Sequence, residues 1–252
     1  MIRMEFFEQK YILFYTLALV AEILGTVSGF GSSILFVPIA SYFFDFHEVL
    51  GITALFHVFS NTSKMLLFRQ AIDKRILLFM GLPAFLFVSI GAWLSRFAPV
   101  DGLKLILSIF LLAISVFLMA GKDRKIEANK KNLILGGTLS GLIAGMVGTG
   151  GAIRGITLSA FSLSKELFIA TSAWIDFGVD ASRLAIYSWN GYVRADFLYM
   201  IPILILISLV GSFLGKKIVL RISESIFRKI VLTLIISLSL LELANYIWKQ
   251  NI

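Results

Sequence analysis

The chain alternates between long apolar stretches and short polar segments, and this pattern predicts a helical membrane protein. Several apolar runs reach the roughly 18–20 residues that a helix needs to cross a bilayer. The predicted segments are 11–28, 33–44, 48–68, 75–95, 102–120, 133–147, 152–162, 166–187, 196–215 and 226–248. Four of them, 11–28, 33–44, 133–147 and 152–162, are short or marginal. They form two pairs, each divided by a glycine-rich break, so we expect re-entrant or broken helices there.

Composition supports this fold class. The 252 residues are 58% hydrophobic and 15% charged, whereas soluble domains are about 25% charged. The first stretch lacks a basic n-region and a cleavage site, so we read it as a mature span. The chain has no cysteine and only two histidines, His47 and His57, so we expect neither thiol chemistry nor a histidine-rich metal site, and no cofactor.

Basic residues predict the orientation in the cell membrane. A net charge of +8 would suggest a nucleic-acid partner in a soluble protein. In a membrane protein, whose partner is membrane lipid, basic residues instead indicate the loops that stay on the cytoplasmic side. One set of loops, which includes 69–75, 122–131 and 216–229, carries 14 Lys and Arg residues, and the opposite set carries 6. Both termini are therefore predicted to be extracytoplasmic, provided that each short pair returns to the side it entered from.

An internal repeat predicts two halves. A shift of 119 residues aligns 22–92 with the second half without a gap, with eight identities in 71 positions. Loop 69–75 is predicted cytoplasmic and its counterpart 188–194 external, so the repeat is predicted to be inverted; the alternative is chance similarity between apolar segments. Inverted halves with broken helices are typical of secondary transporters. The predicted organisation is a first repeat (1–121), a basic linker (122–132) and a second repeat (133–252). Each repeat has a broken pair plus three transmembrane helices.

The two breaks, "SGFGSS" (28–33) and "VGTGG" (147–151), are the candidate binding site. Irregular backbone inside a membrane is tolerated only where protein buries it or where it lines a wet cavity. Each break precedes a short helix whose N-terminus suits an anion. The candidate donors are Gly29, Gly31, Ser32, Ser33, Thr149, Gly150, Gly151 and Arg154.

Arg154 is the most telling of these donors because a cation in the first turn of a helix opposes the helix dipole. A bound anion would compensate that charge. The alternatives are an ion pair with Asp176, Asp180 or Glu22, and an arginine that snorkels to the cytoplasmic face.

Two polar helix faces occupy matching positions in the repeat. His57, Asn61 and Lys64 share one face through their i, i+4, i+7 spacing, and Asp176, Asp180 and Arg183 repeat it. His57 and Asn61 are candidate anion ligands. The two aspartates are candidate proton carriers, and the alternative is a structural pair between Asp180 and Arg183. Lys64 and Arg183 alternatively snorkel to the interfaces, and Glu22 faces the cavity or caps the broken helix.

The motifs "SGFGSSILFVP" and "GLIAGMVGTGGAIRG", followed by "IATSAWIDFGVDASRLAIY", resemble the sulfite exporter TauE/SafE family. The resemblance implies a permease that moves a small sulfur-containing anion, such as sulfite, a sulfonate or thiosulfate, with protons as a candidate coupling ion. The chain departs from the family pattern at Phe30, Ser32 and Ser33, where glycine is denser in the family, and at Arg154-Gly155. The alternatives are an anion channel, an intramembrane enzyme and a membrane scaffold. No catalytic pattern stands out, so we do not expect an enzyme.

Overall fold

The computed structural model describes residues 9–28, 30–69, 72–120 and 127–219, with four single positions beyond them. This part of the chain is helical and contains no strand, which confirms the all-α prediction. Four of its helices are long and apolar enough to cross a membrane: Gln9–Ser28, Lys74–Phe97, Val100–Phe117 and Ile201–Ile218. Residues 122–126 of the predicted linker lie outside the described residues, as does the predicted span 226–248 apart from four single positions.

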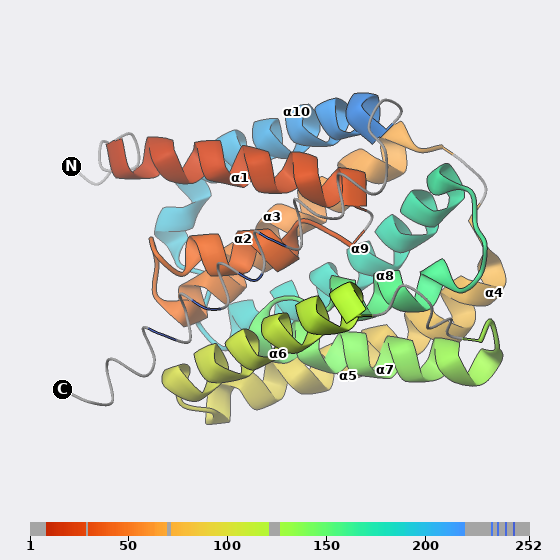
Figure 1. Cartoon of the computed structure of the whole chain (residues 1–252). Coiled ribbons are helices and arrows are strands. Elements are labelled where there is room, and N and C mark those ends of the chain that lie inside the picture. The colour runs from red at the N-terminus through yellow and green to blue at the C-terminus, as the bar shows by residue number, and fades with distance from the viewer. Residues whose placement is uncertain are drawn as a thin grey trace.

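The order of elements recurs along the chain (Figure 1). The first set is α1 (Gln9–Ser28), α2 (Ser33–Ala40), α3 (Phe46–Leu67), α4 (Lys74–Ile76), the π-helical η2 (Leu77–Gly81), α5 (Leu82–Leu94), η3 (Ser95–Phe97) and α6 (Val100–Ala120). The second set is α7 (Lys130–Val147), α8 (Gly151–Ser159), α9 (Lys165–Trp189), the 3-10 helix η4 (Ala195–Tyr199) and α10 (Ile201–Val219). Each set thus contains a long helix, a break, a short helix and a long central helix.

The long members of the two broken pairs exceed the predicted apolar segments. α1 has 20 residues and α7 has 18, so α1 is long enough to cross a membrane, contrary to the prediction that 11–28 is marginal. Polar residues continue each helix beyond its apolar run: α7 begins at Lys130, and the Asn129 side chain caps it by accepting from Asn132 N at 2.8 Å. Only the second members are short, with eight residues in α2 and nine in α8.

Packing between the two sets of helices is reciprocal. α1 packs along α10, and α7 packs along α5. In the predicted repeat, α7 is the counterpart of α1 and α10 is the counterpart of α5. The two central helices, α3 and α9, pack against each other, as do the two short helices α2 and α8. The pairs α1–α10 and α5–α7 form opposite borders of the molecule in Figure 1, with the central helices between them.

Glycine allows the close approach of α5 and α7. Gly137, Gly141 and Gly145 follow one face of α7 at every fourth position. A Cβ atom on each would overlap a carbonyl oxygen of η2 or α5, at Met80, Ala84 and Val88 respectively. Small residues at such spacing let membrane helices touch through their backbones.

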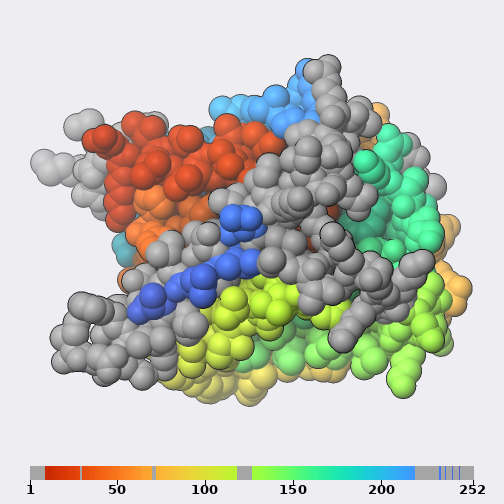
Figure 2. All heavy atoms as spheres, in the orientation of Figure 1, coloured from red at the N-terminus to blue at the C-terminus, as the bar shows by residue number. Residues whose placement is uncertain are grey.

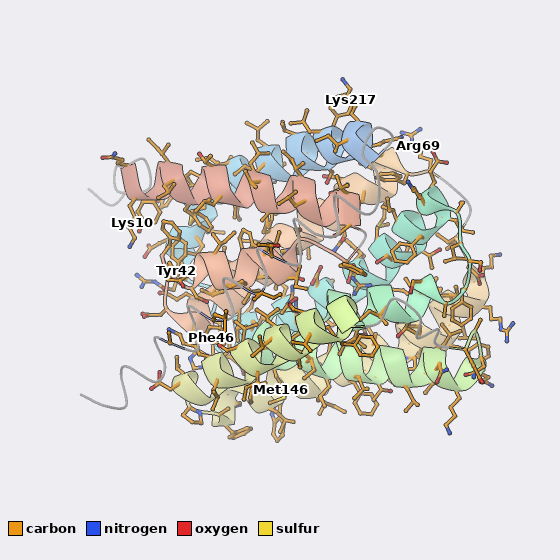
Figure 3. The ribbon with its side chains drawn as sticks, in the orientation of Figure 1. Lys10, Tyr42, Phe46, Arg69, Met146 and Lys217 are labelled. Carbon is orange, nitrogen blue, oxygen red and sulfur yellow. The ribbon has the colours of Figure 1, made fainter. Side chains whose placement is uncertain are left out.

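Large apolar side chains cover the outside of the molecule, as expected for lipid contact. Exposed examples are Phe85, Trp93, Ile109, Leu206 and Phe213. Figure 2 shows one face, with side chains of α1, α6 and α7 at its surface. Charged side chains occur at the ends: Lys10 lies at one end, and Arg69 and Lys217 lie at the other (Figure 3).

Candidate functional site

The two glycine-rich breaks meet at the centre of the fold. Ser33 Oγ lies 3.1 Å from Thr149 Oγ1, although the residues are 116 positions apart. A Cβ atom on Gly151 would overlap the carbonyl oxygen of Phe30, and one on Gly155 would overlap the Phe30 ring. Glycine is therefore needed at these two positions partly because the first break packs directly against them.

Two glycines in the breaks adopt backbone conformations that L residues rarely adopt. Gly31 has φ of 85° and Gly148 has φ of 82°. Gly148 ends α7 in the left-handed conformation, with its N–H donating to Ala144 O at 3.0 Å. Both breaks therefore need glycine for conformation as well as for space.

Arg154 of α8 reaches across to α9. Its Nη1 forms an ion pair with Asp176 Oδ1, and its Nε donates to Ser172 Oγ at 2.9 Å. The Arg154 side chain is 4% exposed and the Asp176 side chain 15% exposed, so the carboxylate is the more accessible partner. The Asp176 carboxylate thus neutralises the Arg154 guanidinium inside the fold.

A second buried pair lies farther along α9. Arg183 Nη2 is 2.7 Å from Asp180 Oδ1, and Asp180 Oδ2 accepts from Asn61 Nδ2 at 2.6 Å. Arg183 Nη1 also donates to Gly148 O at 2.5 Å, so this arginine satisfies a carbonyl at the C-terminus of α7. The pair thereby ties α3, α9 and the second break together.

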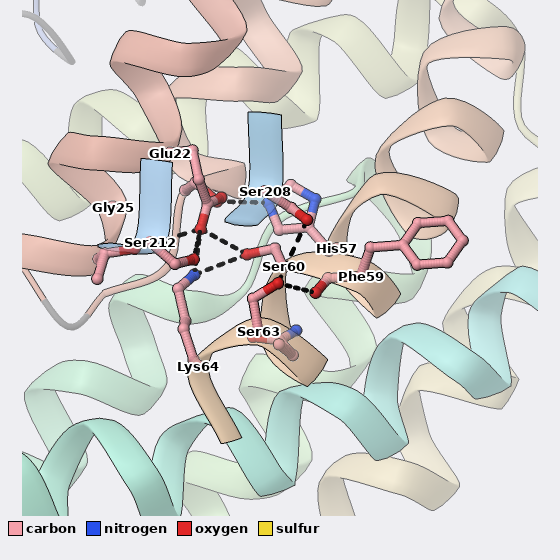
Figure 4. A network of polar contacts seen from close by, with 12 residues as sticks. Glu22, Gly25, His57, Phe59, Ser60, Ser63, Lys64, Ser208 and Ser212 are labelled. Carbon is pink, nitrogen blue, oxygen red and sulfur yellow. Dashed lines mark hydrogen bonds and ion pairs between the residues drawn. The ribbon is translucent and has the colours of Figure 1, made fainter. Parts of the chain in front are cut away.

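Glu22 is the centre of a third polar cluster, shown in Figure 4, and it is fully buried. Its Oε1 accepts from Ser60 Oγ at 2.7 Å and from Ser212 Oγ at 2.8 Å, and it lies 3.0 Å from Lys64 Nζ. Its Oε2 accepts from Ser32 Oγ at 2.6 Å. The cluster links α1, the first break, α3 and α10. Lys64 is buried in it and does not snorkel.

Two cavities flank the meeting point of the breaks. Both are lined by Gly31, Asn61 and Asp176. The first cavity is also lined by Ser33, His57, Ala144, Gly148, Gly150, Gly151, Arg154, Val179, Asp180 and Arg183. The second is also lined by Gly25, Thr26, Lys64, Ile169, Ser172 and Ala173. Lys64 lies in the last turn of α3 and Ile169 near the start of α9, so the second cavity lies toward the end of the molecule that holds Arg69.

Most of the predicted site residues come together. Ten line the first cavity: Gly31, Ser33, His57, Asn61, Gly150, Gly151, Arg154, Asp176, Asp180 and Arg183. Three line neither cavity: Glu22, Ser32 and Thr149. The Ser32 hydroxyl is directed to Glu22 and to His57 Nε2, at 2.6 and 2.9 Å, so in this structure it is engaged away from the cavities. Gly29 lies outside the described residues.

Several hydroxyl residues of the polar clusters were missed at the level of sequence. Ser172 lies one helical turn before Asp176, so the i, i+4 spacing carried a usable signal for it. Ser60 and Ser212 contact Glu22 from two other helices, and nothing in the local pattern distinguishes them from other serines in apolar helices. Within the described residues, no group of three or more His, Cys, Asp or Glu side chains is placed to hold a metal ion.

Comparison with known proteins identifies the family. No curated protein and no solved structure matches the chain. The family model described as sulfite exporter TauE/SafE matches residues 14–241, which contain both breaks, both cavities and the three buried ion pairs described above. The chain therefore belongs to the sulfite exporter TauE/SafE family of membrane transport proteins.

Proposed function

We propose that this protein is a secondary transporter that moves a small sulfur-containing anion, such as sulfite, a sulfonate or thiosulfate, across the cell membrane. The anion binds where the two breaks meet and contacts Arg154. One observation carries this proposal: the two cavities share Gly31, Asn61 and Asp176, and Arg154 is paired to the last of these. A site between two cavities is the arrangement that alternating access requires.

Asp176 serves as an internal substitute for the substrate in this proposal. A buried arginine without a negative partner is strongly unfavourable, so Arg154 needs a carboxylate or an anion at all times. When the anion arrives, it replaces the Asp176 carboxylate on the guanidinium, and Asp176 returns when the anion leaves. The partial exposure of Asp176 and its place in the walls of both cavities support this exchange.

The two sets of helices act as the two moving halves. Reciprocal packing of α1 on α10 and α7 on α5 supports an arrangement with approximate two-fold symmetry. Together with the charge distribution of the loops, this supports inverted halves in the membrane and a carrier that rocks one half against the other. In this proposal the end that holds Arg69 and Lys217 faces the cytoplasm.

The test is sulfite flux in proteoliposomes. Wild-type protein is expected to give saturable uptake of radiolabelled sulfite and counterflow against a sulfite gradient. Arg154→Ala is expected to abolish both. Arg194→Ala is the matched control, because Arg194 also forms carboxylate pairs but its side chain is 58% exposed at the surface. Flux that does not saturate and never concentrates sulfite would identify an anion channel, and unchanged flux in Arg154→Ala would remove Arg154 from the site.

A further inference from the structure

The contacts around Ser32 require more hydrogens than a neutral His57, a Ser32 hydroxyl and an ionised Glu22 supply. His57 Nδ1 lies 2.7 Å from Thr53 O, His57 Nε2 lies 2.9 Å from Ser32 Oγ, and Ser32 Oγ lies 2.6 Å from Glu22 Oε2. A carbonyl oxygen only accepts, so the first contact uses a hydrogen on Nδ1. The second and third contacts need two further hydrogens, and the serine hydroxyl carries only one.

One added proton would supply the missing hydrogen. With Glu22 ionised and His57 neutral, two hydrogens serve three contacts, and one pair of acceptors would face each other within hydrogen-bond distance. One added proton completes the set. If it is on His57 Nε2, the imidazolium donates to Ser32 Oγ and Ser32 donates to Glu22. If it is on Glu22 Oε2, the carboxyl donates to Ser32 Oγ and Ser32 donates to His57.

The geometry points to a proton-binding relay formed by Glu22, Ser32 and His57, which takes up one proton when a monovalent anion binds at the neighbouring site. This inference rests on the proposed function. Transfer along the relay is balanced: as Nε2 of His57 gives its proton to Ser32 Oγ, the Ser32 hydroxyl gives its own to Glu22 Oε2. The proton enters from water.

The surroundings leave Glu22 Oε2 to the relay. Oε1 takes the contacts from Thr26, Ser60 and Ser212 and from the Lys64 ammonium, whereas Oε2 accepts from Ser32. At its other end the relay reaches the anion site, because His57 lines the first cavity with Arg154 and Asp176. A proton on the relay therefore lies beside the position where the anion binds.

Charge balance connects the proton to the anion. Charged groups face the relay from α3 (Lys64), from α8 (Arg154) and from α9 (Asp176, Asp180 and Arg183), while α10 contributes the Ser212 hydroxyl. Together with Glu22 these charges form three pairs of opposite sign and cancel. The added proton makes this buried region positive by one charge, and a bound monovalent anion restores neutrality. Unbalanced charge is costly inside a membrane, so the two ligands favour each other's binding.

The test compares two modes of sulfite movement in proteoliposomes: net efflux, which must carry the proton, and exchange of labelled for unlabelled sulfite at equal concentrations, which need not. Ser32→Ala interrupts the relay without changing a charge. We expect the ratio of net efflux to exchange to fall roughly tenfold, because the variant lacks one hydrogen bond along the path of the proton. His57→Asn, which keeps an amide donor for Thr53 O but removes Nε2, is expected to act alike. Wild type and variants are measured in the same sulfite solution, so a difference in the ratio comes from the protein and not from protonation of sulfite in water.

Ser212→Ala is the matched control, because it also removes a hydroxyl from Glu22 but on Oε1, away from His57. Its ratio is expected to equal that of wild type, and the pH dependence of net efflux is expected to flatten only in the relay variants. Equal ratios in Ser32→Ala and wild type would overturn the relay, as would parallel loss of both modes in Ser32→Ala and His57→Asn. If wild type moves no sulfite in either mode, the proposed function itself fails.

Discussion

Asn61 Nδ2 donates to Asp180 Oδ2 at 2.6 Å, and the two residues are separated by 119 positions, which is also the shift that aligns the two halves of the sequence. Two equivalent residues touch only if they lie near the axis that relates their halves. The contact is the one expected at the axis of the predicted repeat, and it lies between α3 and α9, where Asn61 lines both cavities.

This contact predicts a coupled effect on stability. Asn61→Asp places two carboxyl groups together in a buried site, where Arg183 pairs with Asp180. We expect it to lower the free energy of unfolding by about 3 kcal/mol. The double variant Asn61→Asp/Asp180→Asn restores an amide–carboxylate pair and is expected to recover much of the loss. Thermal unfolding in detergent measures both. Additive losses in the double variant would show that the two side chains do not interact.

Removal of the internal carboxylate is expected to strengthen anion binding. Asp176→Asn leaves Arg154 with an amide in place of a charge, so the anion no longer competes with Asp176. We expect the apparent affinity for sulfite to rise roughly tenfold and turnover to fall, because release then leaves the arginine unpaired. A thermal-shift titration with sulfite measures the affinity. Weaker binding in Asp176→Asn would mean that the aspartate supports the anion and does not replace it.

The glycine stripe of α7 is expected to control the stability of the α5–α7 pair. Gly141→Ala places a Cβ atom on the carbonyl oxygen of Ala84, so the helices must separate. We expect a loss of about 1–3 kcal/mol in the free energy of unfolding. Gly178→Ala in α9 is the control, since its Cβ atom meets nothing within 4 Å. The control is expected to gain about 0.5–1 kcal/mol, since alanine favours a helix. A gain in both variants would contradict the close contact.

The general fold could be predicted from sequence because a lipid bilayer restricts both the length of apolar helices and the positions of charged residues. The two breaks, the short helices α2 and α8, and the cluster of ten cavity-lining residues follow from glycine in apolar surroundings and from charges at helical spacing. The length of α1 was underestimated because polar residues such as Gln9 extend the helix beyond its apolar run.

The partners of the charged side chains were not accessible from sequence. Arg154 had three candidate partners on two helices, and only the packing of α8 on α9 selects Asp176. Ser32 looked like an anion donor from its place in the first break, but the direction of its hydroxyl depends on where α1 and α3 bring Glu22 and His57. Contacts of this kind depend on tertiary geometry, which local patterns do not encode.

Labelling of single cysteines tests alternating access most directly, because the chain has no cysteine of its own. Ala144→Cys places a thiol in the wall of the first cavity and Ala173→Cys places one in the wall of the second. A membrane-impermeant thiol reagent is applied to each side of oriented vesicles in separate experiments, with and without sulfite. We predict opposite responses: sulfite raises the labelling rate at one position and lowers it at the other. Equal changes at both positions, or simultaneous access from both sides, would contradict a carrier and indicate an open pore.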